Sequence, residues 1–112
     1  MEKWIGFRFE SSTGLTPEFA QFAKEIKKYI KNILAPIGAE LISFNRGHFY
    51  VSGFIKKDSK YVYFSISDVR GTEWGYDKIL VRTARDSKDY FGGDNCWTNL
   101  PKFTERVKDL FA

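Results

Sequence analysis

The chain holds few side chains of the kinds that enzymes use for nucleophilic or acid–base catalysis. His48 is the only histidine and Cys96 the only cysteine. A Cys–His pair works only when the two side chains touch, and the spacing of these two residues does not imply such a contact. We therefore predict no catalytic residue, and we expect that the protein is not an enzyme.

Acidic residues gather in the segments that connect the later predicted strands. They are Asp68, Glu73, Asp86, Asp89 and Asp94. Carboxylates on adjacent loops can hold Mg²⁺, as they do in nucleases, but these residues follow no metal-ligand spacing. The chain also lacks the glycine patterns that bind phosphates and dinucleotides. We predict no metal site and no cofactor, and a metal-dependent nuclease stands third among the functional hypotheses.

Tyrosines and arginines alternate with apolar residues in several predicted strands. A period of two places Tyr50, Tyr61 and Tyr63 on the face opposite the core, and the same face receives Arg8 and Arg82. Single-strand nucleic-acid binders stack bases on such a face, at about 1–3 kcal/mol per base. The alternative is that these side chains are ordinary cross-strand pairs on the wet face of a sheet.

Two long predicted loops, at residues 69–77 and 86–97, flank one strand and combine aromatic, basic and glycine residues. Loops of this length within a compact domain commonly carry binding residues. If both loops share one edge of the sheet, they form the kind of patch that dominates protein–protein interfaces, made of Arg70, Trp74, Arg85, Tyr90 and Trp97. The alternative is that Trp74 and Trp97 are buried beneath their own loops.

Four lysines form a basic ridge on the polar side of the first predicted helix, namely Lys24, Lys27, Lys28 and Lys31. The chain has a net charge of +4 and an isoelectric point near 9.2, which favours polyanionic or acidic partners. The ridge could lie along phosphates and contribute salt-sensitive affinity. The alternative is that it is the solvated face of an amphipathic helix.

The first helix is predicted at residues 17–34. Thr16 is a suitable N-cap, Pro17 fits the first helical position, and Pro36 ends the helix. Between these limits apolar residues recur every three or four positions, from Phe19 to Leu34. This spacing predicts a single buried stripe along the helix.

Apolar and polar residues alternate with a period of two in five segments, which predicts strands at residues 3–9, 39–45, 48–56, 61–68 and 78–85. In the first segment Ile5, Phe7 and Phe9 would face the core and Trp4 the opposite side. A second helix is expected after Thr98, which would serve as its N-cap. The predicted order is therefore β-α-β-β-β-β-α.

Short connections make consecutive strands antiparallel. The predicted fold class is thus α+β, with a single antiparallel sheet of about five strands and two helices packed on one face. The 112 residues, 43% of them hydrophobic and 18% aromatic, are enough for a single domain over residues 1–112 with a core that needs no disulfide. The lone cysteine fits a reducing compartment, and we expect neither a signal peptide nor a membrane span but a cytoplasmic protein.

The leading functional hypothesis is a small binding module without catalytic activity. Its basic and aromatic surface would engage single-stranded DNA or RNA, or a protein that handles nucleic acid. The alternative is a compact inhibitor or adaptor that binds a protein with its two long loops. A phage or mobile-element protein that blocks a host defence nuclease, in the manner of an anti-CRISPR protein, would be an example. Exposed strand edges would also allow a homodimer through sheet extension.

Overall fold

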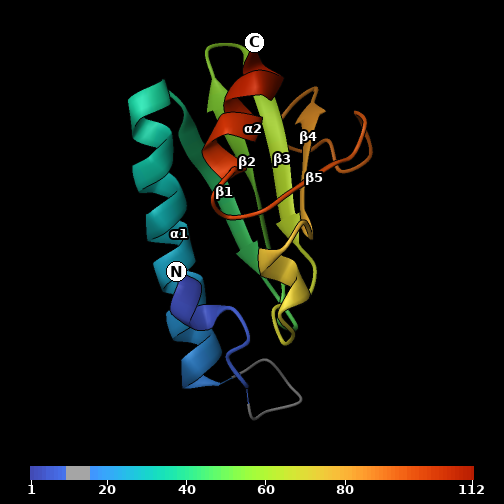
Figure 1. Ribbon diagram of the computed structural model, residues 1–112. Helices are drawn as coiled ribbons and strands as arrows, with labels where there is room; N and C mark the ends of the chain where they lie inside the picture. The colour runs from blue at the N-terminus through green and yellow to red at the C-terminus, as the bar shows by residue number, and fades with distance from the viewer. Residues whose placement is uncertain (10–15) are drawn as a thin grey trace.

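Helix α1, Pro17–Leu34, lies where the sequence predicts it in the computed structural model (Figure 1). The structure describes residues 1–9 and 16–112. The Thr16 hydroxyl accepts a hydrogen bond from the backbone N–H of Phe19 at 3.3 Å, which confirms the predicted N-cap. A short 3-10 helix, Ala35–Ile37, continues α1 and ends at Gly38, whose φ of 73° is left-handed and suits glycine.

Five strands form one antiparallel sheet in chain order, so that each strand pairs with its sequence neighbours. They are β1 Glu40–Arg46, β2 Val51–Lys57, β3 Lys60–Ile66, β4 Ile79–Ala84 and β5 Cys96–Thr98. A second helix, α2, spans Phe103–Phe111. The predicted α+β fold class, with one antiparallel sheet and two helices, is confirmed. Within the described residues, the helices are too short or too polar to cross a bilayer.

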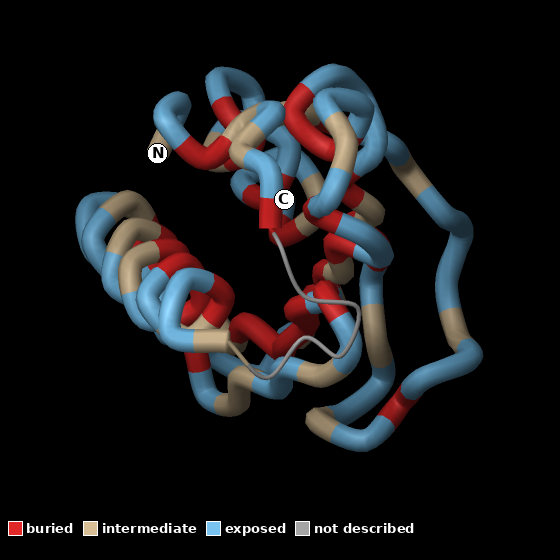
Figure 2. Tube along the Cα trace, turned by 90° about the horizontal axis from the view of Figure 1, so that it is seen from below, coloured by how far each residue is buried: buried red, intermediate tan, exposed pale blue. Residues whose placement is uncertain are grey.

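Both helices pack on the same face of the sheet and enclose one hydrophobic core. Figure 2 shows the buried residues on the inward side of α1 and on the strands that face it. From α2, Phe103 meets Phe64 of β3 edge-on, with ring centroids 5.9 Å apart. Ile79 and Val81 of β4 join the same core, as the alternation of that strand predicts.

The N-terminal segment differs from the prediction, because residues 3–9 form no strand. Glu2–Trp4 is a 3-10 helix, and Gly6 follows with a φ of 80°, which breaks an extended chain. Trp4 was expected on the outer face but is only 6% exposed, since its ring packs in the core against Phe9 and Phe22 at centroid distances of 5.9 and 5.6 Å. The aromatic side chains of this segment turn toward one core, so their alternation does not indicate a strand.

The fifth strand comes instead from the C-terminal part of the chain. β5 pairs with residues 79–81 of β4, which places Thr98 in the sheet and corrects its predicted role as an N-cap. Helix α2 begins five residues later, at Phe103. In the turn between them the side-chain oxygen of Asn99 accepts a hydrogen bond from the backbone N–H of Lys102 at 3.0 Å. The turn thus separates strand from helix where the sequence suggested a direct start.

Candidate binding surface on the outer sheet face

The outer face of the sheet, turned away from α1 and α2, holds a second apolar cluster. Strand register aligns Phe54 of β2, Tyr63 of β3 and Arg82 of β4 in one cross-strand row. Tyr90, from the loop between β4 and β5, lies over this row, with its ring centroid 5.2 Å from that of Phe54 and 5.8 Å from that of Tyr63. Phe54 is 0% exposed. The open platform expected from Tyr63 and Arg82 is therefore covered by the loop.

Arg82 points toward the outer face, as predicted, but its side chain is buried. The guanidinium donates hydrogen bonds to the backbone carbonyl oxygens of Asp89 at 2.7 Å and Thr83 at 3.3 Å. It also lies 4.5 Å from the centroid of the Tyr63 ring, a cation–π contact. At 3% exposure Arg82 cannot reach a phosphate or a partner. Its predicted contact role is corrected: the residue holds the overlying loop from below.

Asp89 fixes the same loop from within. Its carboxylate accepts hydrogen bonds from the backbone N–H groups of Arg85 at 2.9 Å, Gly92 at 2.7 Å and Phe91 at 3.2 Å, and Arg85 adds an ion pair at 3.4 Å. The hydrogen bond from Arg85, followed by those from Gly92 and Phe91 and by the charge of Arg85, outweighs desolvation and lowers the pKa of Asp89 to about 2. The ionised carboxylate thus closes the loop into a compact turn.

The loop held by Arg82 and Asp89 and the strand β5 that follows it present aromatic side chains to solvent. Phe91 is 97% exposed, Tyr90 50% and Trp97 51%. Trp97 lies on the outer side of β5, where the register pairs it with Leu80 of β4. We refer to Leu80, Tyr90, Phe91 and Trp97 together as the aromatic loop surface.

The sequence predictions include Tyr90 and Trp97 but not Phe91. The signal that points to Phe91 is its position directly before Gly92 and Gly93, a pair typical of tight turns whose neighbours are exposed. Gly93 has a φ of 78°, and a Cβ there would collide with the carbonyl oxygen of Thr83. Glycine is therefore required in the turn that exposes Phe91.

The loop between β3 and β4 places Trp74 and Arg70 in different environments. Trp74 is 1% exposed and packs against Phe22 of α1 at a centroid distance of 5.6 Å, so the predicted contact role of its indole is corrected to a role in the core. Arg70 stays exposed, where it pairs with Asp68 at 2.8 Å and lies 4.9 Å over the Phe49 ring. The hydrogen bonds from Arg70 lower the pKa of Asp68.

The remaining predicted contact residues lie on separate parts of the surface. Tyr50, 39% exposed, precedes β2 and occupies the space beside Gly47. Tyr61 of β3 is half-buried, with the Lys56 Nζ 5.6 Å from its ring centroid. Arg8 is exposed, but it belongs to the N-terminal segment on the helix side of the sheet (Figure 1). The predicted set is therefore divided between the two faces of the molecule.

All residues of the basic ridge, namely Lys24, Lys27, Lys28 and Lys31, are exposed on α1. Helix α1 covers the face of the sheet opposite the aromatic loop surface. The thickness of the sheet and of the helix layer therefore separates the lysines from the exposed aromatic rings. A single nucleic-acid platform that combines the ridge with sheet tyrosines is not formed.

The loop carboxylates do not gather around a common point, and two of them form local ion pairs. Asp68 pairs with Arg70, and Asp89 pairs with Arg85. Within residues 1–9 and 16–112, no group of three His, Cys, Asp or Glu side chains has the geometry to hold a metal ion.

No protein-family model, curated protein or solved structure matches the chain. Its function is therefore inferred from the positions, exposure and charge of its own side chains. The features that bear on function are the loop held by buried polar contacts, the aromatic rings that this loop exposes, and the lysine ridge on the opposite side.

Proposed function

We propose that this protein is a non-catalytic binding module that docks on a partner protein through the aromatic loop surface. The observation that carries the proposal is Phe91, a large apolar side chain that is 97% exposed on a loop held by buried polar contacts. An exposed ring on an ordered loop adds nothing to the folding free energy and lowers solubility. Tyr90 and Trp97 are also exposed, and a patch of exposed apolar side chains is typical of an interaction site.

The composition of the surface favours a protein over a nucleic acid. Protein interfaces are enriched in aromatic residues and arginine, and these residues supply most binding hot spots. The loop exposes Arg85 and Lys88 next to Asp86 and Asp94, so its exposed formal charges balance. A nucleic-acid site needs a surplus of positive charge to neutralise phosphates.

The internal contacts of the loop also support a binding role. Ordering a flexible loop on binding opposes association, at about 0.5–1.5 kcal/mol for each immobilised side chain. The contacts of Arg82 with the Asp89 carbonyl and of the Asp89 carboxylate with three N–H groups already fix the backbone beneath Tyr90 and Phe91. The partner therefore meets a surface that is arranged before it binds.

More specifically, we propose that the protein is a compact inhibitor or adaptor. Its partner would be a protein that handles nucleic acid, such as a host defence nuclease. The molecule has an accessible surface of 6674 Å² and extends over 40 × 25 × 22 Å. A standard interface removes about 800 Å² from each partner, roughly an eighth of this surface. A partner of this kind would cover the aromatic loop surface together with its surroundings on β4 and β5.

The test replaces Phe91 with the photo-crosslinking residue p-benzoylphenylalanine in cells that produce the protein naturally. The matched control places the same residue at Tyr76, which is 67% exposed on a different face. We expect a discrete protein adduct from position 91 that disappears when Trp97→Ala is added. Equal adducts from positions 91 and 76, or none from position 91, would contradict the proposal.

A second candidate function is nucleic-acid binding along the basic ridge. The observation that favours it is that all these lysines are exposed on one helix, and no ion pair in the described part of the chain engages them. Fluorescence anisotropy with labelled single-stranded and duplex oligonucleotides at about 50 and 200 mM salt tests it, because phosphate-driven binding weakens steeply over this range.

The variant for this second test is the pair Lys27→Gln and Lys31→Gln on α1. Its charge-matched control is the pair Lys102→Gln and Lys108→Gln near and on α2, where the lysines are also exposed. Binding that falls with the α1 pair alone supports the ridge. Binding that is insensitive to salt, or that falls equally with the control, excludes it.

A further inference from the structure

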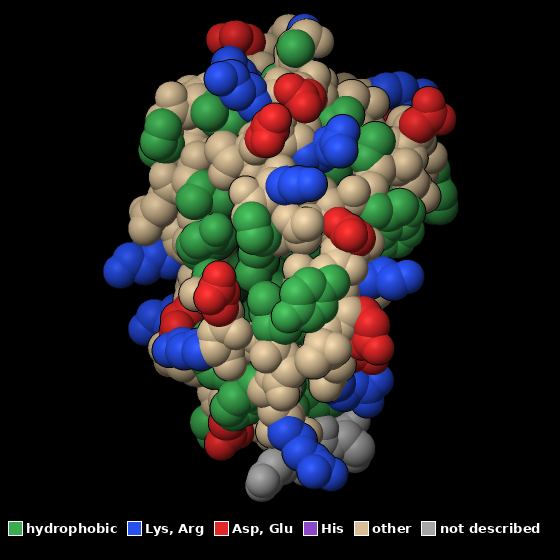
Figure 3. All heavy atoms as spheres, in the orientation of Figure 1, with side chains coloured by type: hydrophobic (Ala, Val, Ile, Leu, Met, Phe, Trp, Pro, Cys, Tyr) green, Lys and Arg blue, Asp and Glu red, His purple; other side chains and the backbone are tan. Residues whose placement is uncertain are grey.

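The basic ridge on α1 gathers like charges on one side of the molecule. Lys24 and Lys28, four residues apart, form one row along the helix. Lys27 and Lys31, with the same spacing, form the row beside it. With a rise of 1.5 Å per residue, the ridge is about 10 Å long. In Figure 3 lysine and arginine side chains project from the left margin of the molecule, which α1 forms in Figure 1.

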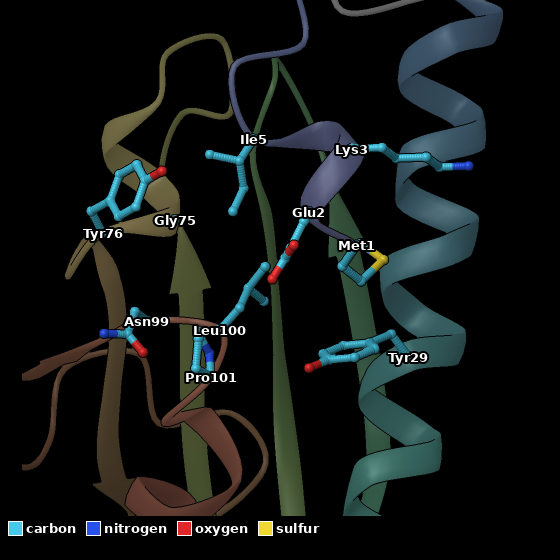
Figure 4. Close-up of a pocket in the computed structure, with 10 residues that line it drawn as sticks. All are labelled: Met1, Glu2, Lys3, Ile5, Tyr29, Gly75, Tyr76, Asn99, Leu100 and Pro101. Carbon is cyan, nitrogen blue, oxygen red and sulfur yellow. The ribbon is translucent and has the colours of Figure 1, made fainter.

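The acidic residues of α1 do not cancel this charge. The Glu25 carboxylate is already engaged, because it accepts a hydrogen bond from Gln21 Nε2 at 2.9 Å and pairs with the Lys3 ammonium at 3.1 Å. Figure 4 shows Lys3 extending toward the helix. Glu18, the other acidic residue of α1, lies in the first turn, well before Lys24. The ridge therefore keeps an excess of positive charge, which is complementary to a polyanion.

Lys57 adds a further cation just beyond the end of α1. It is the last residue of β2, and the alternation of that strand places it on the helix-bearing face together with Ile55. A Cβ at Gly38, the residue that ends the 3-10 helix after α1, would lie 3.9 Å from the Lys57 Cε. The positive surface thus continues from the helix onto the sheet.

The aromatic rings near the ridge are not open to a nucleic-acid base. Phe19 and Phe22 of α1 are buried, and Tyr29 is half-buried and points into the pocket shown in Figure 4. The half-buried Phe44 ring lies under Lys27, whose Nζ is 5.9 Å from the ring centroid. Proteins that bind single strands stack the bases on aromatic rings beside a basic groove. Lysines without such rings favour a duplex, whose bases are already stacked.

The form of α1 favours duplex DNA over a membrane or duplex RNA. A helix that binds a membrane surface inserts its apolar side chains, whereas Phe22, Ile26 and Ile30 of α1 are buried in the core. The major groove of B-form DNA, about 12 Å wide, admits an α-helix, and two rows of lysines would then face the phosphates on its two sides. The major groove of duplex RNA is deep and narrow and does not offer this fit.

We propose that α1 binds duplex DNA through the basic ridge, with the lysine ammonium groups on the phosphates and without reading the base sequence. This inference rests on the second candidate function and narrows it to one kind of nucleic acid. Lysine is a compact charge on a flexible stem, and phosphate contacts carry no sequence information. Because the ridge and the aromatic loop surface lie on opposite faces, bound DNA leaves the aromatic loop surface uncovered.

The experiment measures the fluorescence anisotropy of labelled duplex DNA of about 20 base pairs with the full chain, at salt concentrations from about 50 to 200 mM. If all ridge lysines contact phosphates, the logarithm of the association constant falls against the logarithm of the salt concentration with a slope of about −3.6, which is roughly a 100-fold loss over this range. We expect two unrelated DNA sequences to bind equally. Single-stranded DNA and duplex RNA of the same length should bind at least about fivefold more weakly.

The pair Lys27→Gln and Lys31→Gln should bring the slope to about −1.8, because it removes one row of contacts, whereas the control pair Lys102→Gln and Lys108→Gln should leave the slope unchanged. Single-stranded DNA or duplex RNA that binds as tightly as duplex DNA would overturn the assignment to duplex DNA and leave the second candidate function standing. Failure of every oligonucleotide to bind at about 50 mM salt would overturn both. Displacement of the DNA by phosphatidylserine vesicles at equal phosphate concentration would reassign the ridge to a membrane surface.

Discussion

At the scale of single residues, the candidate surface depends on two buried charges that do not pair with each other. Arg82 is 3% exposed and is satisfied by carbonyl oxygens and the Tyr63 ring, whereas Asp89 is 6% exposed and is satisfied mainly by backbone N–H groups. Burying a charge is unfavourable unless its hydrogen-bonding capacity is met. The contacts of both residues therefore tie the conformation of the loop to its position on the sheet.

Acid is expected to loosen this loop through Asp89. The pKa of Asp89 is about 2 in the folded protein, against an ordinary value of 3.8. A lowered pKa means that the carboxylate stabilises the folded loop fully above about pH 4 and loses this effect as the pH falls toward 2. Amide hydrogen exchange at Arg85 and Gly92, the principal donors to the carboxylate, should therefore accelerate over that interval relative to exchange in the core strands.

Asp89→Asn provides the control for this prediction, because the amide cannot ionise. The variant should show faster exchange at Arg85 and Gly92 at neutral pH and no further loosening of the loop between pH 4 and 2. Asp68 and Glu25 also have lowered pKa values, so global stability falls in acid for other reasons. An acid response of the loop that Asp89→Asn leaves unchanged would assign the effect to those groups.

At the scale of elements, β2 is the strand most enclosed by its surroundings. Residues 51–55 are all buried, because the helix-side core covers one face and the Tyr90 cluster covers the other. Gly53 lies at the centre of this stretch, paired with Phe44 of β1 and Phe64 of β3. A Cβ at this position would collide with the carbonyl oxygen of Ser43 and lie 2.9 Å from the Phe64 ring.

Gly53→Ala is therefore expected to destabilise the protein by about 1–3 kcal/mol, the usual penalty for overpacking a core. The backbone of β1 cannot move aside without breaking its pairing with β2. Ser65→Ala, on the neighbouring strand and the opposite face, should change stability by less than about 0.5 kcal/mol. Urea unfolding followed by tryptophan fluorescence measures both, and similar midpoints for the two variants would show that the strand can accommodate the methyl group.

Elements with strong local signals could be predicted from the sequence, and elements defined by distant contacts could not. Helix α1 has an N-cap, a first-turn proline and a continuous apolar stripe, and β1 to β4 alternate between recognisable turns. The three residues of β5 are too few to show a period, and Thr98 suits an N-cap as well as a strand. At the N-terminus, Gly6 and the packing of Trp4 into the core override the alternation.

In the candidate site, too, features with a local sequence signal could be predicted and features that depend on distant contacts could not. Tyr90 could be predicted as an exposed loop aromatic from its neighbours in the sequence. Arg82 is buried because the loop between β4 and β5 folds back over β4. Trp74 is buried because it contacts Phe22 of α1, which is far away in the chain. Neither contact leaves a periodic pattern in the sequence. The sequence alone therefore does not distinguish buried residues that fix the loop, such as Arg82, from exposed residues that could contact a partner, such as Tyr90.

At the scale of the whole molecule, the aromatic residues of the core and the exposed Phe91 have different roles. Trp4, Phe9 and Phe22 belong to a network of packed rings in the core, and the Trp4 indole also donates to the Glu25 carboxylate at 3.3 Å. Phe91 stands almost free of the protein. Stability should therefore depend on the first group and partner binding on the second.

Trp4→Ala and Phe91→Ala test this separation. Trp4→Ala is expected to cost about 3–5 kcal/mol, because it opens a cavity in the core, and to lower the melting temperature by more than about 10 °C. Phe91→Ala should change stability by less than about 0.5 kcal/mol. Differential scanning calorimetry distinguishes the two, and a large destabilisation by Phe91→Ala would mean that its ring supports the fold and is not reserved for a partner.

The irregular register of β1 should limit association between molecules in concentrated solution. β1 and β5 are the two edge strands of the sheet. β5 has only three residues, and the pairing of β1 with β2 shifts register between Leu41 and Ser43. A strand added along β1 would lose its alignment at this shift, and a strand added along β5 would find few groups to bond. Both features disfavour the growth of a fibre by strand addition, so the molecule should stay dispersed at concentrations where a protein with a long, flat edge strand would aggregate.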